Sequence, residues 1–451
     1  CYATGTLNRV PNHFVREIMA YMSASSEKLK IPGEIRVLIA AAFIIAIGFG
    51  IITPVLPSYA ESFGVGAFGV SAVVSIFGLA RLILAPLSGR ATTRFGESPV
   101  YITGVTIVGI SMFLVAFAQT YPQLLIFRGL GGFGSTLFTV SAMSFLAAKS
   151  PPAIRGRVSG AYASAFLIGN ISGPLVGGLL VGLGPRAPFL IYGGSLLIAS
   201  LVVYLGLHRK KGQKRHEIVD ERVPWSFAEA IKDNSYKAAL GSFFANGWAT
   251  FGVRNAIMPL FAASAFAGTG FVLDGAQTAA VALSIFAVGN VLAVTFLSRY
   301  SDKYGRKPFI VGGLFVAAVG TGVLGFMTDP WLFFIASLVA GAGTGMLNAP
   351  QQASIADLVG QERKAGTVMS SAQMASDVGS IIGPLFIGWI VDIYGFQLGF
   401  GISGLILAAA GVIWIFAPET NVRVVPNGPR TGQLPKISST TKEPDSHSDD
   451  T

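Results

Sequence analysis

Twelve runs of roughly 20 apolar residues limit how this chain can fold more than any other feature. Each run can cross a hydrocarbon core of about 30 Å as a helix. A backbone inside lipid must satisfy its own hydrogen bonds, so the runs predict helices. They lie near residues 37–58, 67–88, 99–118, 124–148, 158–183, 187–207, 238–263, 276–298, 309–327, 331–356, 366–391 and 398–417. The sequence therefore predicts an all-α membrane protein with twelve transmembrane helices.

Composition supports lipid as the main solvent and partner. The chain is 52% hydrophobic and 12% charged, with a mean hydropathy of +0.62, so it has too little charge to cover a soluble surface. It has one cysteine, and its four histidines lie outside the apolar runs, so no disulfide framework and no metal site is expected. The sequence shows no cluster typical of hydrolytic or metal-dependent catalysis, and an enzyme is not expected.

One long hydrophilic stretch, near residues 208–236, divides the spans into two sets of six. The segment after residue 418 is polar and contains proline, as disordered tails do. The expected organisation is a cytosolic N-terminal extension (1–35), a first six-helix bundle (36–207), a central cytosolic loop (208–236), a second six-helix bundle (237–418) and a disordered cytosolic tail (419–451).

Basic residues predict the orientation. All but four of the 32 Lys and Arg residues fall on the side that holds both termini. The exceptions are Arg81, Arg128 and Arg254 within spans and Arg186 in a loop on the opposite face. The positive-inside rule then places both termini and the central loop in the cytosol. The basic stretch "RKKGQKR" fits a loop near anionic lipid heads, and nucleic-acid binding is not expected.

The two halves repeat one another. The stretch from Val74 to Pro99 aligns without a gap on Leu283 to Pro308, and "GIITPVLPSYA" from Gly50 aligns on "GVRNAIMPLFA". The motif "GNISGPLVGG" in the fifth span returns as "GSIIGPLFIG" in the eleventh. Three matches in the same order indicate duplication, and two six-helix bundles around a central axis are the expected architecture.

Over residues 36–418 the chain resembles the major facilitator superfamily and, within it, the twelve-span drug:proton antiporters. "SDKYGRKP" resembles the family's loop signature, "FRGLGGFGS" its fourth-span arginine signature, and "GNISGPLVGG" the fifth-span signature associated with exporters. The resemblance implies two pseudo-symmetric six-helix bundles that export small amphipathic compounds by alternating access. It also implies a proton gradient as the energy source, no other cofactor, a monomer, and the inner membrane of a bacterium.

The fifth-span motif predicts a smooth, bent helix. Gly169, Gly173 and Gly177 recur every fourth residue and so line one helix face, while Pro174 bends the helix. Ordinary membrane packing would suffice to explain such glycines. We expect instead a hinge that packs across the interface between the halves, formed by Gly169, Gly173, Pro174, Gly177 and Gly178 with Gly379, Gly383 and Pro384 of the eleventh span.

The loop signature predicts a conformational latch that can form and break. Asp302 is expected to face the start of the fifth span near Gly156. The second-half latch comprises Asp302, Lys303, Gly305, Arg306 and Lys307. In the first half Thr93 replaces the usual acid, which leaves Gly89, Arg94 and Gly96 as remnants. A simple basic turn anchor is the alternative.

Asp377 is the candidate for proton coupling. It lies about eleven residues into the eleventh span, and thus ~17 Å deep at ~1.5 Å per residue. A carboxyl group buried away from water holds its proton at higher pH, as coupling requires. Resemblance assigns Arg128 as the proton-relay arginine. A structural ion pair with Arg128 is the alternative, and the first span lacks the acid that many relatives carry there.

Polar and aromatic residues on the expected pathway predict a substrate cavity. Its candidates are Phe49, Arg81, Phe133, Tyr162, Asn170, Phe244, Asn246, Trp248, Arg254, Asn255, Gln373 and Met374. Three embedded arginines against one acid favour neutral or anionic amphipaths over cations. The alternatives are an uptake or facilitative carrier for a sugar or organic anion, against which the glycine motif argues, and a non-transporting membrane sensor.

Overall fold

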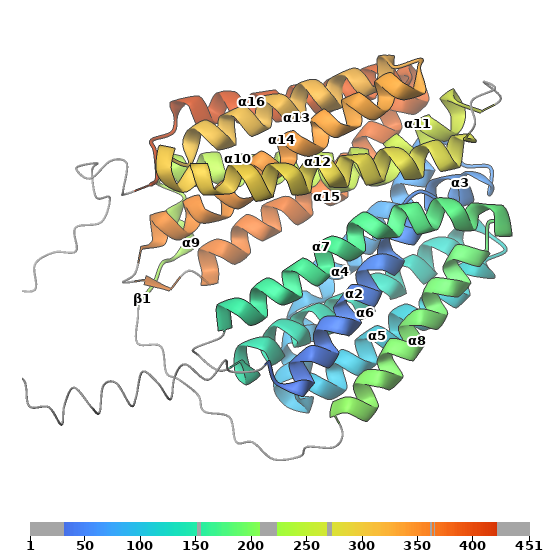
Figure 1. Ribbon diagram of the computed structural model, residues 1–451, viewed down its shortest axis with the longest axis horizontal. Coiled ribbons are helices and arrows are strands. Elements are labelled where there is room, and N and C mark those ends of the chain that lie inside the picture. Colours follow the sequence, from blue (N-terminus) through green and yellow to red (C-terminus); the bar gives the residue numbers. More distant parts are fainter. Residues whose placement is uncertain are drawn as a thin grey trace, which may run out of the picture.

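The computed structural model describes residues 31–150, 155–207, 223–267, 273–360, 363–364 and 366–421. Within these ranges the chain forms two bundles of long helices side by side (Figure 1). One bundle contains α2 to α8 and the other α9 to α16, with the 3-10 and π segments named η in sequence. The expected all-α fold is confirmed.

The first bundle follows the predicted spans closely. Its helices are α2 (Gly33–Ile52), α3 (Leu56–Glu61), α4 (Ala67–Phe95), α5 (Glu97–Ala116), α6 (Tyr121–Lys149), α7 (Arg155–Leu180), η2 (Val181–Leu183) and α8 (Ala187–Leu207). Several helices, among them α4, run beyond their apolar cores, because the residues that follow are polar but still helix-compatible.

The second bundle has the same order with one interruption. Its helices are α9 (Phe227–Ala230), α10 (Asn234–Gly247), η3 (Trp248–Ile257), α11 (Met258–Ala265), α12 (Gly275–Tyr304), α13 (Lys307–Val323), η4 (Leu324–Phe326), α14 (Pro330–Val359), α15 (Gly366–Tyr394) and α16 (Phe396–Phe416). Two short strands, β1 (Val223–Pro224) and β2 (Arg363–Lys364), pair in parallel.

Eleven helices of the described ranges are long and apolar enough to cross a membrane. The remaining predicted span, 238–263, corresponds to α10, η3 and α11 in succession, and η3 is a ten-residue π-helix. Segments of π-helix are rare and concentrate at functional sites. The sequence did not predict this change of winding.

Duplicated glycines end duplicated helices. Gly96 closes α4 with φ +88°, and its counterpart Gly305 closes α12 with φ +105°. A positive φ is strained for any residue with a Cβ, so glycine at these two positions permits the sharp turn into the next helix. The same turn therefore occurs at the same place in both bundles.

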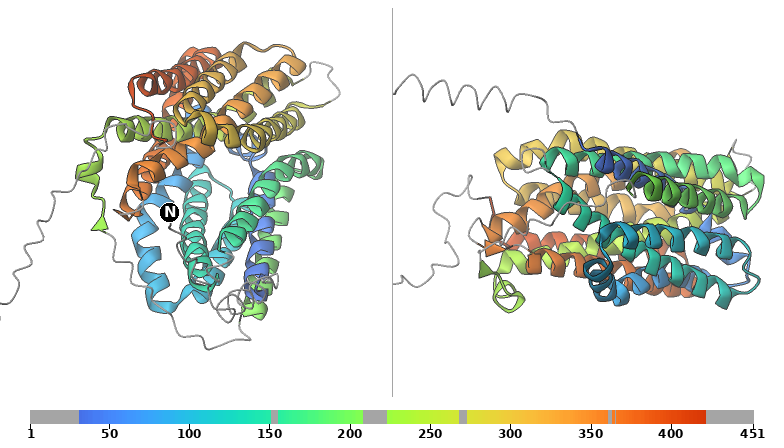
Figure 2. Two further views of the ribbon diagram at one scale, coloured as in Figure 1. Left: turned by 60° about the vertical axis from the view of Figure 1, so that its left-hand side comes forward. Right: turned by 90° about the horizontal axis from the view of Figure 1, so that it is seen from below.

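The bundles meet along a seam formed by two helix pairs, α4 with α15 and α7 with α12. We call the end of the molecule that carries α9, β1 and the ends of α4 and α12 the basic end (left in Figure 1). The opposite end, which carries α3, α11 and the start of α4, is the far end. At the far end α3 also contacts α11. Figure 2 shows the two bundles from other directions.

The segments outside the bundles were expected to be loops or disordered. Residues 1–30, 208–222 and 422–451 lie outside the described ranges. The prediction that disorder begins at residue 419 is wrong for its first three residues, because Glu419 accepts backbone hydrogen bonds that tie it to the start of α13. A carboxylate with several amide donors orders the chain around it.

Candidate functional site

The far end of the seam is joined by polar contacts between the two bundles. The carboxylate of Asp392, on α15, accepts hydrogen bonds from the backbone amides of Ala67 (2.6 Å) and Phe68 (2.9 Å) at the start of α4. Further along the same helix pair, the Ser75 hydroxyl donates to the Ile381 carbonyl oxygen (2.8 Å). Asp392 thus caps a helix of the other bundle, where the helix dipole favours a negative charge. No sequence pattern predicted a role for Asp392.

Glycines along the contact between α4 and α15 show where the seam closes. A Cβ added at Gly78 would meet Ile381 of α15 at 3.2 Å, and near the far end a Cβ at Gly388 would meet Ser71 at 2.5 Å. Gly89 lies three turns after Gly78 on the same face, yet a Cβ there would meet nothing within 4 Å. The α4–α15 contact is therefore tight toward the far end and open toward the basic end.

The second helix pair shows the same pattern. A Cβ added at Gly178 would meet Ala280 of α12 at 2.6 Å. Gly160 lies five turns earlier on the same side of α7, and a Cβ there would meet nothing within 4 Å. Both helix pairs thus close the seam at the far end and leave it open at the basic end.

Arg81 and Asp377 lie one turn beyond the closed part of the seam. Arg81 is one turn past Gly78 on α4, and Asp377 is one turn before Ile381 on α15. The two charges attract each other across the seam, and Gln373 donates a hydrogen bond to the Asp377 carboxylate (3.2 Å). The alternative, a structural ion pair of Asp377 with Arg128, is absent among the described contacts, and Arg81 influences Asp377 electrostatically without a described ion pair.

Arg128 is sealed inside the first bundle. Its residue is 5% exposed, and its guanidinium lies over the Phe77 ring at 4.7 Å. Its Nε has no hydrogen-bond partner in the described part of the chain, while Tyr192 of α8 interacts with it electrostatically. Such a charge holds α4, α6 and α8 together from within the bundle, and proton relay by Arg128 stays a prediction.

A row of neutral polar contacts links helices of the second bundle. The Asn246 amide donates to Asn348 (2.8 Å), Asn290 to Thr344 (3.0 Å), and Gln351 to Ser242 (3.1 Å). Asn246 was predicted as a cavity residue, whereas its partner Asn348 was missed. Because both amides are half-buried, part of each remains available to a ligand.

The other predicted cavity residues divide into two groups. Half-buried or exposed are Phe49, Phe133, Asn170, Phe244, Arg254, Gln373 and Met374, the last 53% exposed. Buried in helix packing are Tyr162, Trp248 and Asn255. Trp248, 4% exposed, donates through Nε1 to the Ser403 hydroxyl of α16 (3.2 Å) and so faces its own bundle.

The spaced glycines pack inside the bundles rather than between them. A Cβ at Gly169 would meet Ala46 of α2 at 2.6 Å, and a Cβ at Gly173 would meet Gly50 of α2 at 2.6 Å. Gly177 likewise meets Ile51 of α2. The expected partner across the interface is therefore wrong for these three residues, because a smooth face favours close approach without specifying to which helix. Only Gly178 of this motif faces the other bundle.

The eleventh-span copy behaves in the same way. Gly379 and Gly383 pack against Trp248 on the segment α10–η3, and Pro384 lies 3.2 Å from a Cβ built at Gly252. These partners all belong to the second bundle. Gly388, at the end of this motif, packs against α4 of the first bundle. In both copies of the motif, therefore, one glycine lies at the seam and the other glycines pack inside their own bundle.

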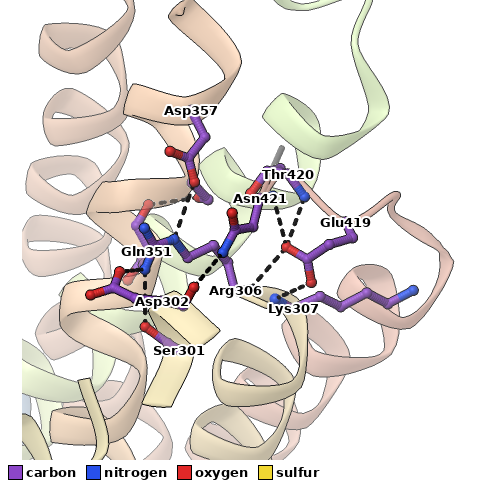
Figure 3. Close-up of polar contacts among 10 residues, drawn as sticks. Ser301, Asp302, Arg306, Lys307, Gln351, Asp357, Glu419, Thr420 and Asn421 are labelled. Carbon is purple, nitrogen blue, oxygen red and sulfur yellow. Dashed lines mark hydrogen bonds and ion pairs between the residues drawn. The ribbon is translucent and has the colours of Figure 1, made fainter. Parts of the chain in front are cut away.

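The predicted latch residues form a charged network at the basic end (Figure 3). Arg306 bonds to Asp302 and, at 3.1 Å, to Asp357 of α14. Burial acts to lower the pKa of Arg306, but the hydrogen bonds and charges of the two acids outweigh it, and the pKa is raised. The Glu419 carboxylate accepts from the backbone amides of Arg306 (2.9 Å) and Lys307 (3.0 Å).

All of these partners belong to the second bundle. The expected contact of Asp302 with the start of α7 is not among the described contacts, and residues 151–154 before α7 lie outside the described ranges. Lys303 lies over the Tyr304 ring, 5.2 Å from its centroid, and a Cβ at Gly305 would meet Glu419 at 2.5 Å. In the first bundle Arg94 lies over Phe95, while Gly89 faces open space.

No cluster of three metal-ligating side chains occurs within the described part of the chain. What the geometry offers instead is a seam between two bundles, closed at one end, with a pair of opposite charges at the limit of closure. Such an arrangement can expose a site to one side of a membrane at a time.

Comparison with known proteins fits this geometry. The sequence profile of the Major Facilitator Superfamily matches residues 38–276 and 248–442. The chain belongs to the Major Facilitator Superfamily. Members of this superfamily are transporters of small molecules in membranes, which confirms the resemblance drawn from the three motifs.

Relatives and solved structures extend the comparison. The chain is 26% identical to the "multi-drug resistance efflux pump PmrA homolog" of Lactococcus lactis, over 83% of this chain and 92% of that protein. It is 24% identical to "multidrug resistance protein 2" of Bacillus subtilis, over 79% and 88%. A bacterial homologue of the lysosomal transporter Spinster, solved inward-facing and unoccupied, superposes with a TM-score of 0.72 at 15% identity, over 88% of this chain and 98% of that one.

Proposed function

We propose that this superfamily member exports small amphipathic compounds across the inner membrane of a bacterium in exchange for protons. The relatives named as multidrug efflux pumps support export, and the fifth-span motif supports it independently. In this proposal the two bundles rock about the seam, and the substrate binds between them at mid-depth. The protein works as a monomer with the proton gradient as its only energy source.

The proposal rests mainly on the positions of the opposite charges Arg81 and Asp377. The seam is closed at Gly78 and open at Gly89, and the two opposite charges, which attract each other across the seam, lie on α4 and α15 just past the closed part. A proton on Asp377 removes the attraction to Arg81, so protonation biases how the seam opens. Proton-driven export needs a group of this kind at such a place.

The orientation follows from charge. Outside the spans, nearly all the described lysines and arginines lie at the basic end, so this end faces the cytosol in our proposal. The seam is open at that end, which makes the described state open to the cytosol and closed to the outside. A substrate then enters from the cytosol or the inner leaflet and leaves after the far end opens.

Transport into inverted membrane vesicles with an acidic lumen tests the proposal. Dyes, antibiotics and sugars are offered outside, and accumulation is measured for the wild type and for Asp377→Asn. Glu97→Gln is the matched control, because Glu97 is an acid at the basic end, in the first turn of α5 and away from the seam. We expect wild type and Glu97→Gln to accumulate an amphipath above equilibrium and Asp377→Asn only to equilibrate it.

Three outcomes contradict the proposal. Gradient-dependent accumulation by Asp377→Asn shows that another group couples the proton. Equilibration of a sugar or organic anion by the wild type, unaffected by the gradient, supports the facilitative carrier instead. Binding without any vectorial movement indicates a sensor.

A further inference from the structure

The three arginines inside the membrane spans have different surroundings. Arg81 is attracted electrostatically to the carboxylate of Asp377, and Arg128 is buried beside Phe77 and Tyr192. Arg254 has neither arrangement. It is half-buried, and no described acid lies within ion-pair distance of it.

Neutral groups hold Arg254 in place. Its Nε donates to the side-chain oxygen of Asn255 (3.2 Å), and its guanidinium carbon lies 5.1 Å from the centroid of the Phe286 ring of α12. A ring under one face of the guanidinium fixes the plane of the group. Among the described residues, no oxygen accepts a hydrogen bond from its two terminal nitrogens. The donors best suited to grip a carboxylate are therefore unused.

The π-helix η3 presents Arg254 near the middle of the membrane. The residue lies eleven positions before the end of α11 at the far end, or ~16 Å at ~1.5 Å per residue. Phe286 lies eleven positions into α12 from the same end, so the two side chains are at matching depth. At this depth a guanidinium is too far from the head groups to pair with a lipid phosphate.

The segment also lies at the seam. The π-helix η3 contacts α4 of the first bundle as well as α15 of its own. Arg254 is half-buried on a segment that contacts both bundles, so it lies beside the path that we propose a substrate takes from the basic end. An embedded cation without a counter-charge is costly, and Asp377, the one acid near mid-depth among the described spans, already interacts electrostatically with Arg81.

We propose that Arg254 binds the anionic group of the substrate, a carboxylate or sulfonate on an aromatic amphipath. The inference rests on the proposed export function and narrows its substrate class. The two terminal nitrogens of Arg254 form paired hydrogen bonds to two oxygens of the anion. Asn255 and Phe286 act as positioning residues that hold the guanidinium plane, and the apolar body of the ligand lies in the seam.

Equilibrium binding to the full chain in lipid nanodiscs tests this. The probes are 8-anilinonaphthalene-1-sulfonate and its uncharged parent N-phenyl-1-naphthylamine, which differ only by the sulfonate. Fluorescence is corrected with empty nanodiscs. We expect Arg254→Gln to weaken binding of the sulfonate about tenfold or more, since the substitution removes charge-assisted hydrogen bonds to the sulfonate oxygens. Binding of the uncharged parent should change less than about twofold.

Two further variants keep the test decisive. Arg254→Lys keeps the charge but lacks the two parallel N–H donors of the guanidinium, so its sulfonate affinity should lie between those of the wild type and Arg254→Gln. Arg299→Gln removes an arginine that lies over Tyr300 at the basic end and should bind both probes as the wild type does. If Arg254→Gln fails to fold, the comparison of the wild type with Arg254→Lys still decides.

The inference is overturned if the substitutions weaken both probes equally, if they weaken neither, or if the wild type prefers the uncharged parent. It fails separately from the proposed function, because nanodisc binding needs no gradient. Arg254-dependent sulfonate binding without gradient-driven transport in vesicles refutes only the export proposal. Transport without such binding refutes only the role of Arg254.

Discussion

The two ends of the seam use charged groups in opposite ways. At the far end, Asp392 of one bundle accepts hydrogen bonds from amides at the start of α4 in the other. At the basic end, Arg306 and Glu419 find all their described partners inside the second bundle. A network within one bundle can stabilise it in every state, whereas a contact between bundles must break when they separate. Position relative to the seam therefore decides which charges can gate.

The largest effect is expected from a side chain added at Gly388, where α15 lies close to α4 at the seam. A Cβ at Gly388 would already lie 2.5 Å from Ser71, so Gly388→Leu should prevent far-end closure at a cost of about 1–3 kcal/mol. Distances between spin labels on cysteines at Glu61 and Tyr394, in a Cys1→Ser background, report that end. We expect them to lengthen.

Gly89→Leu is the matched control for that experiment. Gly89 lies on the face of α4 that contains Gly78, but a Cβ there meets nothing within 4 Å, so the described state accommodates a leucine at this position. We expect unchanged far-end distances and loss of the opposite state, in which the basic end closes. Equal distance changes in Gly388→Leu and Gly89→Leu would show that the two ends do not differ as described.

Asp392→Asn tests the cap between bundles. The substitution removes a charge from a helix N-terminus, an effect of about 0.3–1 kcal/mol and up to ~2 when partly buried. The open fraction at the far end should rise roughly two- to fivefold, as measured by the same spin-label pair. Asp329→Asn is the control, because Asp329 caps α14 within its own bundle with the same kind of bonds. A shift in the control as large as in Asp392→Asn would remove the distinction.

Glu419→Gln should act on stability alone. Glu419 accepts from four backbone amides near the start of α13, all in the second bundle. Losing the charged acceptor should lower the unfolding free energy by about 1–2 kcal/mol and the melting temperature by a few degrees. The spin-label distances at the far end should not move. A change in those distances would mean that the basic-end network senses the other bundle.

The smallest effect concerns the missing first-half network. Thr93 and Glu97 occupy the positions of Asp302 and Arg306 in the duplicated loop. Thr93→Asp alone should destabilise slightly, because it faces the like charge of Glu97. Thr93→Asp with Glu97→Arg should recover about 0.3–0.5 kcal/mol in a double-mutant cycle of thermal unfolding. Coupling of zero would indicate that the second-half pair depends on Asp357 and Glu419 for its geometry.

Hydropathy and repeats predicted the fold because both follow from local sequence. The spans and the two halves could be predicted from apolar runs and aligned motifs, whereas the positive φ of Gly96 and Gly305 is seen only in the structure. The helix that a glycine packs against could not be predicted in this way. Gly169 and Gly178 belong to the same motif, yet Gly169 packs against its own bundle and Gly178 against the other. Partner choice depends on how whole helices pack.

The candidate site was predicted less completely. Asp377 was named from its depth in a span and Arg81 as an arginine within a span, but their electrostatic interaction was not predicted, because it joins residues nearly 300 positions apart. Asp392 and Glu419 were missed, since an acid at a helix end resembles any solvated terminus. An acid beside the outer end of the duplicated eleventh span is the one signal that could have pointed to Asp392.

The π-helix η3 has a consequence for how this protein can vary. A five-residue hydrogen-bond step fits more residues into a turn than the α-helix does, so a deletion between Trp248 and Ile257 would shift the winding of this segment toward that of its flanking helices. Every side chain within the segment would then rotate relative to the seam, and Arg254 would point elsewhere. With Arg254 binding the anionic group as proposed, such a deletion would change the selectivity for charge while the surrounding helices stay the same.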